Sequence, residues 1–325
     1  GLAAVQVAGI LFHPLLLVLA AVVIATAVSP LAARLERWVP RVAAVLLVYL
    51  AVFLVFTLIG WVVVPPLAEQ AETLAVRAPE LASGTQQWLE ERGIAVDGEI
   101  QASIGSSLER VATSVLTLAP AIFAASLEIF LVLAMSVYLV IAAPAMLSFM
   151  LSLFPADQRD RVRDVLTEMA RTTGGYVRGT VLDGLIVAVI AYIGLTIIGV
   201  DFPLVLALLA FLGELVPVVG PIVAAVPAVG IALTESVTQA AIVAVFYLVL
   251  QQFESYVLLP NIMRSQADIP PLLTLIALVA GAAIAGIVGA ILAIPLLGGV
   301  YVFVIRVVAP GIRAWNGADA TDRGL

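Results

Sequence analysis

Three glutamates lie inside apolar stretches of the sequence, where an ionisable side chain is costly. Glu214 lies close to two prolines, Glu254 follows two glutamines, and Glu128 lies about ten residues into a long apolar run. A charged side chain at the centre of a membrane helix costs about 2.5–3.5 kcal/mol on insertion scales. This cost makes each glutamate a candidate for binding a proton, a cation or a polar substrate. The structural alternatives are a helix-end cap for Glu214, an interfacial position for Glu254 and a helix–helix hydrogen bond for Glu128.

Other polar residues near these spans are assigned by their spacing. Gln251 lies three residues before Glu254, on the same face of a helix, and is therefore a second candidate ligand. Asn261 is a candidate as a polar group at a helix end. Asp183 is near the start of a span and five residues from Arg178, so we expect an interfacial ion pair between them.

The inventory of side chains excludes several other kinds of chemistry. The chain has no Cys, and its only histidine is His13, which excludes thiol chemistry and a His-based metal site. The absence of Lys excludes a Walker-type ATPase. We therefore expect no enzyme activity, no catalytic residue, no metal centre and no cofactor. Transport would be passive or driven by an ion gradient.

The composition is that of an integral membrane protein. Apolar residues make up 63% of the 325 residues and charged residues 11%, whereas soluble domains carry about 25% charged residues. The surplus of apolar surface predicts contact with membrane lipid. The net charge of −7, without a basic patch, indicates no nucleic-acid partner.

Two apolar stretches, Pro203–Thr234 and Pro271–Val308, are too long for a single membrane crossing. As straight helices each would be roughly 50 Å long, against about 30 Å of hydrocarbon. Glycines and prolines interrupt both, so each is expected to fold as a broken or re-entrant hairpin, a feature of transport sites. The residues expected to set this geometry are Gly213, Pro217, Gly220 and Pro221 in the first stretch, and Gly281, Gly286, Gly289 and Pro295 in the second.

Arginine positions set the expected orientation. Alternating the chain through its spans places twelve of the fifteen arginines on one side, which the positive-inside rule assigns to the cytoplasm. The first hairpin then enters from outside and the second from the cytoplasm, which suggests an inverted repeat. The alternative is that the small residues serve only helix packing.

The predicted fold is all-α, a polytopic helical membrane protein, and its parts follow from hydropathy and charge. Segment 151–180 carries charges of alternating sign, which are typical of a helix on the membrane surface or, alternatively, of a coupling helix. The first helix is expected to begin upstream of Gly1. The predicted segments are N-terminal transmembrane helices over 1–66, an acidic extracytoplasmic helical cap over 67–118, a transmembrane helix over 119–150, the cytoplasmic amphipathic helix over 151–180, a transmembrane core over 181–310 that holds both hairpins, and a cytoplasmic tail over 311–325.

Several dispersed motifs resemble those of one transporter family. The strings Glu214–Ala228 and Gln251–Ile262 are similar to the hairpin and following-span motifs of the autoinducer-2 exporter family, also called PerM-type permeases. Ser29–Arg37, Gly175–Gly179 and Leu292–Leu296 fit the same pattern in the same order, so the resemblance covers essentially the whole chain.

The resemblance implies a multi-pass protein of the bacterial inner membrane that forms homo-oligomers, with pentamers as one form. It implies export of a small polar metabolite, such as the furanone-derived quorum signal, or alternatively Na⁺(Li⁺)/H⁺ antiport through intramembrane carboxylates. A third reading is a membrane scaffold, which has little use for costly carboxylates beside broken helices.

Overall fold

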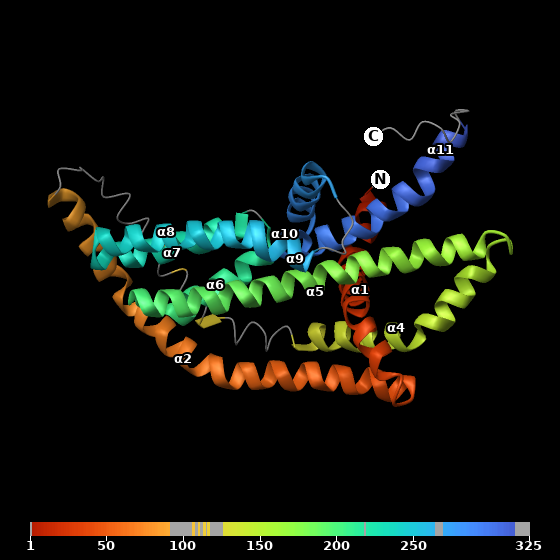
Figure 1. Ribbon diagram of the computed structural model, residues 1–325, viewed down its shortest axis with the longest axis horizontal. Helices are drawn as coiled ribbons and strands as arrows, with labels where there is room; N and C mark the ends of the chain where they lie inside the picture. The colour runs from red at the N-terminus through yellow and green to blue at the C-terminus, as the bar shows by residue number, and fades with distance from the viewer. Residues whose placement is uncertain are drawn as a thin grey trace. The chain divides into compact units, whose positions relative to one another are not determined.

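The computed structural model describes residues 2–91, 106–107, 110, 113–114, 116–117, 126–217, 219–263 and 269–315. All regular structure in these ranges is helical, which confirms the all-α prediction. The elements, drawn in Figure 1, are α1 (Leu2–Leu35), α2 (Arg41–Glu91), α4 (Ser126–Ser152), α5 (Arg159–Ile198), α6 (Pro203–Glu214), α7 (Val219–Glu235), α8 (Val237–Phe253), the π-turn η1 (Glu254–Leu258), α9 (Leu259–Ile262), α10 (Pro271–Phe303), the π-turn η2 (Val304–Val308) and α11 (Ala309–Trp315).

Five helical stretches among the described residues are long and apolar enough to cross a membrane. Their surfaces are mostly apolar and exposed, as expected for helices that face lipid. This confirms the polytopic helical membrane fold. The stretches are Phe12–Leu35, Leu127–Ser152, Arg159–Ile198, Val237–Ile262 and Pro271–Ile312.

The chain forms two compact units. Unit 1 consists of Gly1–Ala51, Leu127–Gly179 and Met263–Leu325, and unit 2 consists of Val52–Ser126 and Thr180–Ile262. The core of unit 1 includes Ala32, Val45 and Val140. The core of unit 2 surrounds α6, α7 and α8, and α7 and α8 lie side by side (Figure 1).

Two helices are longer than the predicted segments. The single helix α5 joins the expected cytoplasmic helix to the start of the predicted transmembrane core, and α2 continues past the predicted boundary at residue 66 as far as Glu91. Hydropathy changes along both helices, but a change of solvent alone does not end a backbone hydrogen-bond ladder. Much of the predicted cap over 67–118 and of the tail over 311–325 lies outside the described residues.

The first predicted break separates α6 from α7. α6 ends at Glu214, α7 begins at Val219, and the N–H of Val219 donates to the Pro217 carbonyl at 2.8 Å. A Cβ on Gly220 would overlap the carbonyl group of Gly213, so the two backbones touch. The predicted helix–break–helix is present, and its small residues allow this close approach. The entry and return of the hairpin on one side of the membrane stays a prediction.

The second predicted break lies inside α10. Ala285 and Gly286 leave helical geometry, and Gly286 has φ +59°, which favours glycine. A Cβ on Gly281 would meet the Gly289 carbonyl oxygen, although residues eight apart would be about 12 Å apart along a straight helix. The chain therefore folds back at Gly286, one of the residues expected to set this geometry. Beyond the turn, the carbonyl of Pro295 accepts a hydrogen bond from Thr173 Oγ1 at 3.0 Å.

The start of α6 is held by side chains of α2. Gln70 Oε1 accepts the N–H of Leu204 at 3.1 Å, and Arg77 pairs with Asp201 at 2.7 Å. Between these contacts Phe202 adopts the left-handed conformation, with φ 60°, and lies under the Arg77 guanidinium. Together they fix the end of α6 that lies opposite Glu214.

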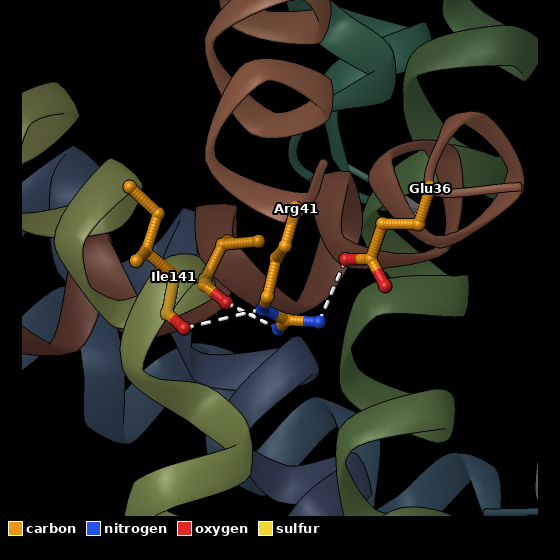
Figure 2. Close-up of polar contacts among 4 residues, drawn as sticks. Glu36, Arg41 and Ile141 are labelled. Carbon is orange, nitrogen blue, oxygen red and sulfur yellow. Dashed lines mark hydrogen bonds and ion pairs between the residues drawn. The ribbon is translucent and has the colours of Figure 1, made fainter. Parts of the chain in front are cut away.

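Arginines in unit 1 bind backbone carbonyls that prolines leave free. Pro144 has no N–H to offer the carbonyl of Val140, four residues earlier in α4. Arg41 Nη2 donates to that carbonyl at 2.5 Å, and its Nε donates to the Ile141 carbonyl at 3.1 Å. Figure 2 shows the same guanidinium reaching Glu36, at 2.7 Å.

The same arrangement occurs at two other prolines of unit 1. Pro30 frees the carbonyl of Thr26 in α1, and Arg178 Nη1 donates to it at 3.2 Å. Pro310 offers no N–H to the carbonyl of Arg306, which accepts Arg161 Nη2 at 3.1 Å. Because lipid offers no hydrogen-bond partner, these three carbonyls depend on donors from within the protein.

We predict that Arg41→Met lowers the free energy of unfolding by about 2 kcal/mol, because a buried carbonyl loses a charged donor. Denaturant titration in detergent micelles measures the change, and Arg37→Met, at an exposed position, is the matched control. In a Pro144→Ala background the restored N–H binds the Val140 carbonyl, so the loss should shrink. An equal loss in both backgrounds would show that the freed carbonyl is not what Arg41 stabilises.

Gly220→Ala should destabilise the protein by roughly 3 kcal/mol, because its Cβ would overlap the Gly213 backbone, which cannot move aside cheaply. The comparison is Gly230→Ala in the same helix, where a new Cβ meets no atom within 4 Å. Thermal unfolding monitored by circular dichroism should separate the two variants. Similar melting temperatures for both would contradict the backbone contact.

Candidate functional site

Three carboxylates from three helical segments meet inside unit 2. Asp183 comes from α5, Glu214 is the last residue of α6, and Glu254 is the first residue of η1. One carboxylate oxygen from each lies within 4.8 Å of the other two. All three side chains are buried, with exposed fractions of 3%, 6% and 5%. This carboxylate cluster is the candidate functional site.

A glycine lets α5 approach α6 at the cluster. Gly184 follows Asp183, and a Cβ there would lie 3.3 Å from the Cβ of Glu214 and 3.2 Å from the Phe211 ring. A larger residue at 184 would push the two helices apart. α6 ends at Glu214, so the glutamate is held at a helix terminus in the interior of unit 2.

A π-turn places the third carboxylate. In η1 the N–H of Leu259 donates to the carbonyl of Glu254, five residues earlier, just before Pro260. Proline removes one α-helical hydrogen bond, and a widened turn of this kind is frequent at functional sites. Gln251, on the preceding turn, donates from Nε2 to Glu254 Oε2 at 3.1 Å. The amide thereby fixes one oxygen of Glu254.

The electrostatics of the cluster are unfavourable when it is fully ionised. At 4.8 Å and an effective dielectric constant of about 20, two unit charges repel by about 3.5 kcal/mol. Among the described residues no salt bridge involves Asp183, Glu214 or Glu254. Asp183 Oδ1 is buried and has no hydrogen-bond partner in the same part of the chain. Protons or a cation must therefore balance these charges.

The cavity beside Glu214 and Glu254 is small. Its volume is about 10 Å³, which is enough for about one water molecule. Its walls are mostly apolar, and the polar groups on it are few. The lining residues are Val187, Ala210, Glu214, Pro221, Ala224, Tyr247, Leu250, Gln251 and Glu254.

The structure brings together three of the five candidates for substrate or ion binding. Glu214, Gln251 and Glu254 meet at the cavity. Glu128 belongs to unit 1, is half-exposed, and lies 3.3 Å from His13. Asn261 Nδ2 donates to the carbonyl of Val257 in the preceding turn at 2.7 Å, so its amide closes a helix end.

The predicted interfacial ion pair of Asp183 is wrong. Arg178 donates instead to the carbonyls of Thr26 and Ala27, and Asp183 is buried in the cluster. Residues five apart on a helix point about 140° away from each other, so Asp183 and Arg178 face different neighbours. The sequence feature that could have indicated the buried position of Asp183 is the neighbouring Gly184 in an apolar span, since a small residue lets two membrane helices pack closely.

Comparisons with known proteins agree with a transport role. Residues 2–309 match the family model described as "AI-2E family transporter". "Putative transport protein YrrI" of Bacillus subtilis (strain 168) is 30% identical over 276 residues, which are 80% of this chain and 76% of that protein. "Putative transport protein MT0215" of Mycobacterium tuberculosis (strain CDC 1551 / Oshkosh) is 30% identical over 269 residues, 80% of this chain and 73% of that protein. The names of these two relatives give no substrate.

We predict that Asp183→Asn raises the free energy of unfolding by about 1 kcal/mol in a buffer free of metal cations, because one of three acids that repel one another on ionisation becomes a neutral amide. Asp164→Asn, at an exposed site on the same helix, is the control and should change little. Unfolding in N-methylglucamine buffer measures both variants. A clear destabilisation by Asp183→Asn would instead indicate that an ion pair stabilises Asp183 and that repulsion by the two glutamates does not dominate.

Proposed function

Because the chain belongs to the AI-2E transporter family, we propose that it is a secondary transporter that exchanges Na⁺ or Li⁺ for protons across the cytoplasmic membrane. One observation carries the proposal: three buried carboxylates, without a basic partner among the described residues, lie beside a cavity the size of a water molecule. Carboxylate oxygens are the ligands that hard cations prefer.

The exchange follows from competition for the same oxygens. A cation among the three carboxylates balances negative charge, and so does a proton on one of them, but both cannot occupy one oxygen lone pair. The apolar walls of the cavity make a net negative charge expensive. Loading a cation therefore favours release of a proton, and loading a proton favours release of the cation.

Export of a polar metabolite is the alternative function. Binding pockets for small organic molecules usually have volumes of about 300–1,000 Å³, far more than the cavity at the carboxylates offers. A larger cavity, about 480 Å³ in the same measure, lies between α1, α4 and α5 of unit 1, and its walls are largely apolar. A polar metabolite finds few partners there. The size and chemistry of the carboxylate site therefore favour the cation.

Glu214→Gln should abolish cation-dependent proton flux, because an amide can neither lose a proton nor neutralise a cation. Purified protein in proteoliposomes with a trapped pH dye is exposed to Na⁺ or Li⁺ gradients. The control is Glu235→Gln, an exposed acid at the end of the same hairpin, which should keep the wild-type flux.

Two results would overturn this function. One is the absence of any cation-dependent pH change in wild-type vesicles that still release a furanone signal, which would favour metabolite export. The other is full activity in Glu214→Gln, which would separate transport from the carboxylate cluster.

A further inference from the structure

Tyr247 lies on the helix face that carries the ligands of the cluster. It precedes Gln251 by four residues and Glu254 by seven, spacings that place all three on one side of α8 and η1. Its ring packs edge-on against Phe246, with the ring centroids 5.6 Å apart, at the edge of the unit 2 core. Tyr247 also lines the cavity beside Glu214 and Glu254.

The hydroxyl of Tyr247 is buried and has no hydrogen-bond partner among the described residues. A buried polar atom without a partner costs about 1–3 kcal/mol, and tyrosine hydroxyls inside proteins usually find one. Phenylalanine would supply the same ring packing without this cost. Packing alone therefore does not explain the hydroxyl, whereas a ligand in the cavity would.

We propose that Tyr247 is a specificity-determining ligand, whose hydroxyl oxygen binds the same cation as Glu214 and Glu254, the two carboxylates that line its cavity. This inference rests on the proposed cation exchange and adds a neutral oxygen to its site. A hard monovalent cation needs several oxygen ligands, whereas a proton needs a single basic oxygen. A neutral hydroxyl thus adds affinity for the cation without adding negative charge, and the carboxylates alone bind the proton.

Two observations point to the hydroxyl rather than to another polar group. Gln251 already donates to Glu254, which leaves its amide oriented by that bond. The Tyr247 hydroxyl is buried and unpartnered among the described residues of unit 2, and Tyr247 lines the cavity beside Glu214 and Glu254, as expected of a group that binds a ligand there.

The test is Tyr247→Phe, which removes only the oxygen. Binding of ²²Na⁺ to the purified protein in detergent gives Kd, and the proteoliposome assay gives KM for Na⁺ and the maximal rate. We expect Kd and KM for Na⁺ to rise roughly tenfold, about 1.4 kcal/mol. The maximal rate should stay near that of the wild type, because the proton-binding carboxylates are intact.

The matched control is Tyr256→Phe. Tyr256 lies in η1, two residues after Glu254, and is 76% exposed, so this variant should keep the wild-type Kd. A melting curve for each variant establishes that it is folded. A wild-type Kd for Na⁺ in folded Tyr247→Phe overturns the inference and leaves cation exchange standing. Failure of the wild-type protein itself to bind Na⁺ or Li⁺ overturns both.

Discussion

Lipid offers no hydrogen-bond partner, so each backbone group that a helix break releases must be satisfied inside the protein. This chain breaks its apolar helices often, with prolines in α1, α4, α7 and α10. In unit 1, arginines from other segments bind the carbonyls freed by Pro30, Pro144 and Pro310. Topology prediction uses arginines only to orient the chain in the membrane. Here they also donate hydrogen bonds to carbonyls that lack a helical partner, and the broken helices depend on these bonds.

The carboxylates of unit 2 are in the opposite situation. Several arginines elsewhere are paired with carbonyls or acids, yet no salt bridge within the described ranges involves the three acids of the cluster. The same protein that places a guanidinium beside a single freed carbonyl places none beside these three buried acids. This contrast is what marks the three acids as the candidate site, and it comes from the structure rather than from any relative.

Sequence reasoning reached the parts of the site that have a strong local signal. Glu214 and Glu254 are acids in apolar spans, and Gln251 follows from helical spacing. Asp183 and Tyr247 were out of reach, because Asp183 had a plausible partner in Arg178 and tyrosine is ordinary in a membrane helix. Only the packing of α5 on α6 through Gly184 shows what surrounds them. The length of α5 was missed for a related reason, since hydropathy reports solvent rather than backbone continuity.

The glycine contact between α6 and α7 also limits how the site can open. The backbones at Gly213 and Gly220 touch, so at the tip no side chain lies between the two limbs that could slide or repack. The hairpin is therefore stiff at its tip, and it would move as a single rod pivoting near Phe202, where α2 holds the start of α6. For the ion exchange proposed above, access to the carboxylates would then change through tilting of the rigid hairpin rather than through a flexible gate at its tip.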